Sequence, residues 1–407
     1  MPRPDARSAP VAARAARRVA HMGPTVFAEM SALAVRTSSI NLGQGFPDTD
    51  GPASLRAAAA EAVTTGAGLA NQYAPGIGMP ALREAVAAHQ ERHYGLHLDP
   101  ATEVTITTGC TEAIAGALLG LVDPGDEVIV LEPMYDSYSA MIDFAGGVRV
   151  PVLLRAPDFR LDPAALAAAV TERTRLILLN SPHNPTGRVL DDAELAAVAA
   201  VAREHDLVVV TDEVYEHLVF DGRRHTPLAT LPGMAERTLT LSSAGKSWSV
   251  TGWKIGWATG PAPLVGAVTA AKQWLTYTSG SPFQGAVAAA LAGDLPDADF
   301  PHRLADDLQQ RRDQLVGGLA ELGLPAFGVE GTYFATTDVS ALGWASGVAF
   351  CRALPERAGV VAIPSEVFYA EPDAPGAGRH LVRWAFCKRS EVLDAALERL
   401  AGATLTA

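Results

Sequence analysis

Side chains able to do covalent and acid–base chemistry gather in four short segments of this sequence, each directly after a run of apolar residues. The segments are Thr108–Ala113, Asn180–Gly187, Thr211–Tyr215 and Ser242–Trp257. Together they offer a lysine amine, a carboxylic acid, a phenol, an amide and the free N–H groups of a helix start. If the apolar runs are parallel strands, their carboxyl ends meet at one edge of a sheet and the four segments form one crevice.

Each of these groups indicates a function only in combination with the others. The amine of Lys246 is a nucleophile when neutral, yet a lone lysine after a strand is usually a solvated surface charge. Asp212 stands at the carboxyl end of a buried run, where α/β sheets place ligand contacts, although a helix N-cap would explain it equally well. Asn184 offers an amide in a turn fixed by Pro185 and Gly187, and that turn could simply end a strand.

The segment Thr108–Ala113 predicts an anion site. Free N–H groups at a helix start, here those of Cys110 and Thr111, bind anions readily. The sequence contains no G-x-x-x-x-G-K-[ST] loop and no G-x-G-x-x-G fingerprint, so the anion need not belong to a nucleotide. The whole inventory matches the needs of pyridoxal 5′-phosphate (PLP): an amine for its aldehyde, an acid for its ring nitrogen, a phenol and an amide for O3′, and a phosphate cradle.

The elements that position these groups alternate between strand and helix. Periodic Ala- and Leu-rich stretches, such as Glu112–Val122 and Ala193–Glu204, separate short apolar runs. This alternation predicts an α/β fold with a mostly parallel sheet flanked by helices. The predicted strands are Glu103–Thr107, Glu127–Leu131, Leu176–Asn180, Leu207–Thr211 and Thr238–Leu241.

The last hundred residues read as a smaller α+β domain. A long helix, about His302–Leu322, precedes the predicted strands Thr332–Thr336, Val360–Ile363 and His380–Phe386. We therefore expect a large domain over residues 51–295, a small domain over 296–407, and an N-terminal segment, 1–50, that packs on the small domain. The first twenty residues, with five arginines and no compact apolar stretch, predict a frayed terminus rather than a secretion signal.

From about Pro24 to about Leu400 the chain resembles the class I aminotransferases of PLP fold type I. It is similar above all to the branch of kynurenine, glutamine and methionine aminotransferases and of the actinobacterial N-succinyldiaminopimelate type. Besides the Asn184, Asp212 and Lys246 segments, four motifs carry the resemblance: Asn41–Asp48, Asn71–Tyr73, Glu132–Tyr138 and His380–Trp384.

The resemblance implies a role for each matching residue in holding PLP. Lys246 would carry the cofactor as a Schiff base and act as proton-transfer base. Asp212 would pair with the pyridinium nitrogen, Tyr215 and Asn184 would contact O3′, and Tyr135 would stack on the ring. The phosphate would be held by four groups: the N–H groups of Cys110 and Thr111, the Ser243 hydroxyl and the Lys254 ammonium. Many relatives have arginine at the last position, and lysine there gives a less directional contact.

Substrate and partner contacts follow from the same resemblance. Arg383 would grip the substrate α-carboxylate, with Asn184 and Gly45 beside the substrate. Tyr73 would reach the phosphate of a neighbouring subunit, and Trp274–Ser279 would line the partner's pocket, so a homodimer with shared active sites is expected. The implied reaction moves an amino group from an amino acid to a 2-oxo acid in ping-pong order.

Three departures from the family pattern, Met134, Trp248 and Trp384, fall near the predicted pocket and leave the substrate open. The pair could be N-succinyldiaminopimelate and glutamate, or of the kynurenine, methionine or glutamine type. Elimination, replacement or carbon–carbon bond formation on the same scaffold is the alternative, because a fold does not fix a function. A binding module without turnover is disfavoured by the complete residue set.

Composition excludes several other classes of protein function. The net charge of −13 argues against nucleic-acid binding, and no apolar run is long enough for a membrane span. Three distant cysteines predict reduced thiols and a cytoplasmic protein rather than disulfides or a zinc site. None of the ten histidines forms a ligand-like cluster along the sequence, so we expect structural or surface histidines and no metal.

Overall fold

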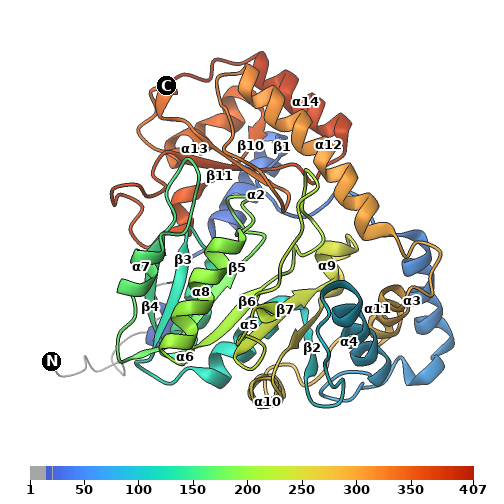
Figure 1. Cartoon of the computed structure of the whole chain (residues 1–407). Coiled ribbons are helices and arrows are strands. Elements are labelled where there is room, and N and C mark those ends of the chain that lie inside the picture. The colour runs from blue at the N-terminus through green and yellow to red at the C-terminus, as the bar shows by residue number, and fades with distance from the viewer. Residues whose placement is uncertain (1–14, 21) are drawn as a thin grey trace.

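A seven-stranded sheet forms the centre of the molecule in the computed structural model, which describes residues 15–20 and 22–407 (Figure 1). The strand order is β2-β8-β7-β6-β5-β3-β4, and β8 alone runs in the direction opposite to the other strands of this sheet. The strands are β2 (Val104–Thr108), β3 (Glu127–Glu132), β4 (Val148–Leu153), β5 (Thr174–Asn180), β6 (Val208–Asp212), β7 (Thr238–Ser243) and β8 (Ile255–Thr259).

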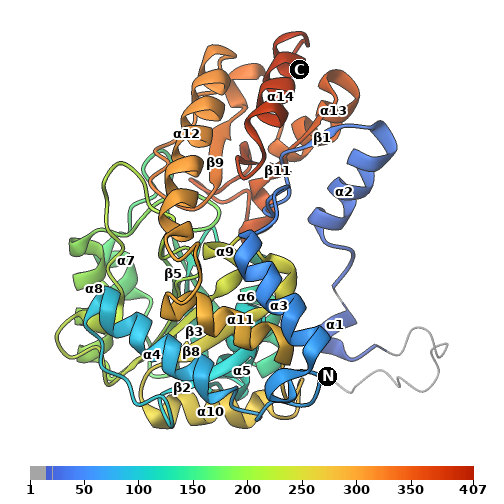
Figure 2. The same cartoon turned by 90° about the vertical axis from the view of Figure 1, so that its right-hand side faces the viewer.

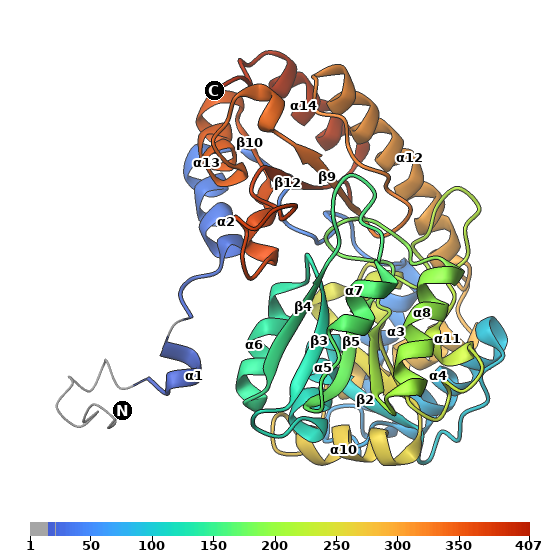
Figure 3. The same ribbon diagram turned by 60° about the vertical axis from the view of Figure 1, so that its left-hand side comes forward.

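Helices cover both faces of this sheet (Figures 1 and 3). They are α3 (Ala53–Thr65), α4 (Pro80–Tyr94), α5 (Gly109–Leu121), α6 (Asp136–Ala145), α7 (Pro163–Ala168), α8 (Asp192–Glu204), α9 (Ala244–Ser247), α10 (Ala262–Lys272) and α11 (Ser281–Ala292). Strand β5 shows why two layers are needed: Leu176 and Leu178 pack into one hydrophobic core, and Ile177 and Leu179 into another. Successive side chains of a strand point to opposite faces, so a doubly covered strand is apolar throughout.

The C-terminal part builds a second, smaller body beside the large one (Figure 3). Its antiparallel sheet has the order β11-β12-β9. The elements are α12 (Phe300–Glu321), β9 (Phe334–Asp338), α13 (Gly347–Ala358), β10 (Val360–Val361), β11 (Ile363–Pro364), β12 (Leu381–Ala385) and α14 (Ser390–Ala401). Helix α12 runs from the large body to the small one, where α14 packs beside it (Figure 2).

The beginning of the chain joins this C-terminal body. Strand β1 (Ile40–Asn41) pairs in parallel with β10, with Ile40 opposite Val360. Helix α2 (Val26–Thr37) packs on α13 and buries Met30, Leu33 and Ala34. A one-turn helix, α1 (Arg17–Ala20), precedes it (Figure 2). The expected frayed terminus falls largely on residues 1–14, outside the described residues, and the domain limits at 50/51 and 295/296 stay predictions.

The predicted mostly parallel α/β sheet is confirmed. Each of the five strands predicted for it is present within about two residues, which is the usual uncertainty of a strand boundary. Two strands of this sheet, β4 and β8, were missed, as was the two-residue strand β1. The predicted strand Val360–Ile363 is really two, β10 and β11, in different sheets. Within the described residues no helix is long and apolar enough to cross a membrane.

Candidate active site

A cavity of about 490 Å³ opens where the predicted strand ends converge. Eleven of the twelve site residues predicted from the sequence line it: Gly45, Cys110, Thr111, Tyr135, Asn184, Asp212, Tyr215, Ser243, Lys246, Lys254 and Arg383. The twelfth, Tyr73, is 84% exposed, away from this chain's cavity, and packs edge-on against Tyr277 at 5.6 Å.

Lys246 reaches the cavity from the short helix α9, directly after β7. Ser243 begins this helix, and its hydroxyl accepts the Gly245 N–H at 3.1 Å. The Lys246 Nζ atom donates to the hydroxyl of Tyr333 at 2.8 Å. Burial disfavours the ammonium and lowers the pKa of Lys246 to about 8, although the charge of Asp212 acts in the opposite direction. Lys246 is thus closer to its nucleophilic form at neutral pH than a surface lysine.

Asp212 ends β6 at the floor of the cavity and is 5% exposed. Its Oδ2 atom accepts the Tyr138 hydroxyl at 2.7 Å, while Oδ1 accepts the Val214 N–H at 3.3 Å and contacts the Cys110 thiol at 3.6 Å. Burial raises the pKa of Asp212, and the Tyr138 hydroxyl opposes that shift. A cation placed against this carboxylate would hold it ionised.

The first turn of α5 and Lys254 form a cradle for an anion. Within the described residues no side chain caps α5, so its first N–H groups stay available. The Lys254 ammonium lies 3.3 Å from the Thr111 hydroxyl. Backbone packing is tight here, because a Cβ added to Gly256 would lie 2.5 Å from the Gly109 carbonyl carbon. Gly256 thus lets β8 bring Lys254 up to the helix start.

Arg383, on β12, brings a buried guanidinium to the same cavity. It donates to the Asn184 Oδ1 at 2.9 Å and to the Gly43 carbonyl at 3.0 Å, and its guanidinium lies 4.0 Å from the centre of the Phe334 ring. Its Nε is buried and has no hydrogen-bond partner among the described residues. Burial lowers the pKa of Arg383 to about 10, although the charge of Asp136, which lines the same cavity, acts in the opposite direction. The guanidinium therefore remains charged at neutral pH.

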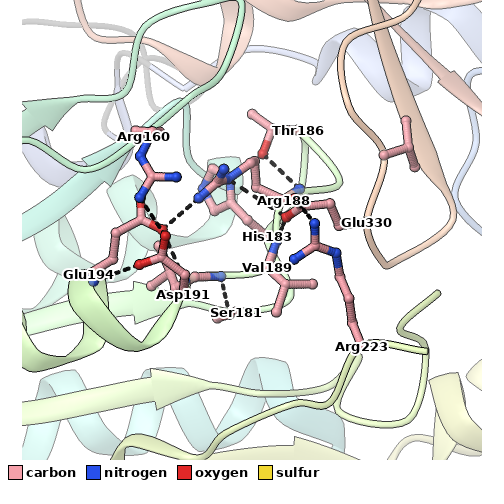
Figure 4. A network of polar contacts seen from close by, with 12 residues as sticks. Arg160, Ser181, His183, Thr186, Arg188, Val189, Asp191, Glu194, Arg223 and Glu330 are labelled. Atoms are coloured by element: carbon pink, nitrogen blue, oxygen red, sulfur yellow. Dashed lines mark hydrogen bonds and ion pairs between the residues drawn. The ribbon is translucent and has the colours of Figure 1, made fainter. Parts of the chain in front are cut away.

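A network of ion pairs supports the turn that carries Asn184 (Figure 4). Arg188 donates to Glu194 at 2.5 Å, and both side chains are buried. Glu194 also completes a capping box with Asp191 at the start of α8. The backbone N–H of His183 then donates to the Arg188 carbonyl at 2.7 Å. The chain therefore ties the turn beside the cavity to a helix on the sheet face.

Sequence reasoning missed two tyrosines. Tyr138 lies within the Glu132–Tyr138 motif, three residues after Tyr135, and holds Asp212; Tyr333 binds Lys246. Spacing from Tyr135 on a helix was a usable signal for the first, whereas the second comes from a distant strand start and left none. The three departures from the family pattern, Met134, Trp248 and Trp384, do not line this cavity and are buried in the core.

The expectation that the histidines form no ligand-like cluster is wrong. His89 and His217 lie together with Glu216. Both histidines line a second cavity of about 250 Å³, as do His93, His302 and Arg92. The fold joins residues that the sequence separates, since α4 carries His89 and the chain after β6 carries His217. The spacing of His89 and His93, four residues apart on one helix, was the signal available in the sequence.

The described residues fit PLP. The amine donor, the buried carboxylate and the uncapped helix start with its lysine face one cavity of suitable size. When bound there, PLP supplies an aldehyde that condenses with amines and a ring that accepts electrons from the amino acid. The chain contributes the amine of Lys246, the negative charge of Asp212 and the anion cradle around Lys254. Fold and site together define a PLP-dependent enzyme of fold type I.

Comparison with known proteins specifies the class. The family model of class I and II aminotransferases matches residues 37–400, and the chain belongs to this family. A probable N-succinyldiaminopimelate aminotransferase of Mycobacterium tuberculosis is 54% identical over 385 residues, covering 92% of this chain and 95% of that one. The methionine aminotransferase of Escherichia coli is 42% identical, covering 94% and 97%. The solved structure of N-succinyldiaminopimelate aminotransferase from M. tuberculosis matches with a TM-score of 0.91 at 52% identity, covering 95% and 99%. The chain is an aminotransferase of the branch that the motifs indicated.

Proposed function

We propose that Lys246 binds PLP and takes the proton from the substrate Cα. Its lowered pKa and its place in the cavity support this role. Asp212 would hold the ring nitrogen protonated, with Tyr138 as its positioning residue. Tyr215 and Asn184 would contact O3′, and Tyr135 would stack on the ring.

The remaining lining groups would bind the two anions. Cys110, Thr111, Ser243 and Lys254 would hold the phosphate. Arg383, with Asn184 and Gly45 beside it, would bind the α-carboxylate of the amino acid. The observation that carries this proposal is the Arg383 guanidinium, which lines a cavity that also contains a lysine amine and whose Nε has no partner among the described residues.

For the substrate pair we propose N-succinyldiaminopimelate and glutamate with their 2-oxo counterparts. The support is the 54% identity to the mycobacterial relative of that name. The single-chain cavity has three cations, Lys246, Lys254 and Arg383, and each already has a proposed partner. A second substrate carboxylate would therefore require basic groups from the neighbouring subunit.

A methionine- or kynurenine-type substrate is the second candidate, because three phenylalanines line the cavity. Phe27 and Phe46 come from the N-terminal segment and Phe334 from β9. Such a surface favours an apolar or aromatic side chain over an acidic one.

One experiment separates the candidates. Purified holoenzyme is mixed with single amino acids, and the cofactor spectrum and the oxo-acid product are followed in a single half-reaction. The proposal expects N-succinyldiaminopimelate to react with the highest ratio of rate to dissociation constant. Preference for methionine or kynurenine by about tenfold or more would favour the second candidate. Release of ammonia without oxo-acid transfer would contradict both.

We further propose a homodimer with shared sites. Tyr73 and Trp274 are 84% and 83% exposed, and Leu275 and Tyr277 beside them are about half exposed. Aromatic groups clustered on a surface are typical of protein interfaces. In the dimer Tyr73 would reach the partner's phosphate site. Trp274→Glu should then shift the sedimentation coefficient from dimer to monomer.

A mixing experiment tests the sharing. Lys246→Ala and Tyr73→Ala chains are each expected to be impaired, and their heterodimer would contain one intact site. Random mixing should restore about a quarter of wild-type activity, since half the dimers are mixed and each has one good site. Dimers that recover no activity would show that each chain builds its own site.

We also propose a cytoplasmic location, because Cys110, Cys351 and Cys387 are unpaired. Cell fractionation tests this location.

A further inference from the structure

The histidine cluster lies outside the active site and has no part in the proposed reaction. His89 and His93 project from α4, and Glu216 and His217 follow β6. The Nε2 atoms of His89 and His217 lie 2.8 Å apart. One ligand atom each from His89, Glu216 and His217 lies within 4.8 Å of the others. His93 adds a third ring, 4.5 Å from His89 and 5.2 Å from His217 between ring centres.

Burial and access suit a bound ion. His89 and Glu216 are 3% and 4% exposed, whereas His93 and His302 are exposed at the edge of the cavity of about 250 Å³. An ion could therefore enter past the exposed rings and reach the buried groups.

Glu216 supplies the charge argument. It accepts hydrogen bonds from the Tyr94 hydroxyl at 2.7 Å and from the Ser242 hydroxyl at 2.6 Å. In the described part of the chain it forms no ion pair with a lysine or arginine. Glu216 is thus a buried carboxylate whose neighbours are imidazoles, and a divalent cation between them would supply a counter-charge. Arg92 also lines the second cavity, but its guanidinium donates to the Leu291 carbonyl at 2.6 Å. Hydroxyl donors behind a carboxylate ligand are the usual outer shell of a metal site.

We propose that His89, Glu216 and His217 form the core of a divalent transition-metal site of the zinc class, completed by His93 or water. Two imidazole nitrogens and a carboxylate are ligands that zinc accepts in tetrahedral geometry. Nitrogens bound to one tetrahedral zinc lie about 3.4 Å apart, so the two Nε2 atoms need to separate by about half an ångström.

The site would act by positioning rather than in the reaction. Glu216 directly follows Tyr215, Ser242 directly precedes Ser243, and Trp248 lines the second cavity two residues after Lys246. A metal here would tie α4 to the strand ends that present the PLP contacts. The inference does not depend on which amino acid is the substrate.

Zinc binding by tag-free holoenzyme tests the proposal without an activity assay. The protein is treated with chelator, dialysed against buffered zinc, and analysed for metal per chain and for thermal midpoint. We expect one zinc per chain and a higher midpoint with zinc than with chelator. Cobalt in place of zinc should show the visible bands of a tetrahedral nitrogen and oxygen site.

Variants localise the metal. His217→Asn should weaken zinc binding at least tenfold, and Glu216→Gln should behave similarly. His93→Ala removes an exposed ring and tests the site even if a core variant fails to fold. His97→Ala is the matched control, because His97 is exposed and pairs with Glu91 instead. Absence of stoichiometric zinc, or equal zinc binding by the control, His217→Asn and His93→Ala proteins, would overturn the proposal in favour of a simple hydrogen-bonded histidine pair.

Discussion

The Tyr333 hydroxyl lies 2.8 Å from the Lys246 Nζ and 2.6 Å from the Gly45 carbonyl oxygen. Lysine donates to this hydroxyl, and the hydroxyl donates in turn to the carbonyl. One phenol at the start of β9 therefore joins the reactive amine of the large body to the loop after β1. The chain of donors fixes the lysine and the loop in one arrangement before any substrate binds.

Tyr333→Phe should reduce kcat by about three- to tenfold, the range that the loss of one hydrogen bond to a charged group implies. Without the hydroxyl, the Lys246 amine and the Gly45 carbonyl each lose a partner. Steady-state kinetics with a good amino donor would measure the change. Tyr369→Phe is the control, because the buried Tyr369 hydroxyl has no partner among the described residues. Equal kcat values for the two variants would show that the hydrogen bond between Tyr333 and Lys246 does not contribute to catalysis.

Arg383→Lys should raise the dissociation constant of the amino acid by about tenfold or more while changing the maximal half-reaction rate less. Lysine retains the charge but loses the fork that contacts Asn184 and Gly43 and leaves Nε for the substrate. Titration of the cofactor spectrum with substrate separates the two quantities. Arg379→Lys, on an exposed loop with Asp373 as its partner, provides the control. A lower maximal half-reaction rate with an unchanged dissociation constant would show that Arg383 does not bind the substrate carboxylate.

The lowered pKa of Lys246 predicts a pH profile for cofactor uptake by the apoenzyme. Burial disfavours the ammonium, so the neutral amine accumulates as the pH rises and predominates above about 8. The uptake rate should increase about tenfold per unit below that pH and then level off, whereas an ordinary lysine would level near about 10.4. Stopped-flow absorbance above about pH 7, where the phosphate charge is constant, measures it. Rates that climb steadily to about pH 10 would contradict the shift.

Glu194→Gln should destabilise the protein by about 3 kcal/mol, because it removes the 2.5 Å ion pair and leaves the buried Arg188 guanidinium only the longer contact of 3.8 Å with Glu330. The thermal midpoint should fall by several degrees, and the loosened Asn184 turn should raise the dissociation constant of the substrate. Calorimetry of the holoenzyme measures the thermal midpoint. Glu204→Gln, an exposed change on the same helix, should leave the midpoint unchanged. Equal thermal midpoints for the Glu194→Gln and Glu204→Gln variants would show that the ion pair between Arg188 and Glu194 contributes no net stability.

The parts of the fold that could be predicted are those that leave a local pattern of apolar residues in the sequence. Strand β5 is apolar at consecutive positions because both faces are covered, and its run was visible in the sequence. Strand β4 was missed because its residues are partly exposed and include Arg149 and Pro151. Strand β8 was missed because its run follows the Lys246 segment closely and returns antiparallel, where the pattern predicts a helix and a crossover.

The predictable part of the site was likewise local. Lys246, Asp212 and Asn184 each stand directly after a strand, and topology brings strand ends together. Tyr333 gave no such signal because it reaches Lys246 from 87 residues further along the chain. The His89–His217 contact spans 128 residues and depends on how α4 packs against the sheet. Contacts of this kind follow from tertiary packing and not from any window of the sequence.

The pairing of β1 with β10 has a consequence for synthesis on the ribosome. Ile40 is made early, but its partner Val360 follows 320 residues later (360 − 40). At about 5–20 residues per second the first strand waits roughly 16–64 s for its partner. During that time the apolar face of α2, with Met30 and Leu33, has no surface to cover it. The nascent large body can form its central sheet first, and the first segment of the chain then becomes one of the last to settle.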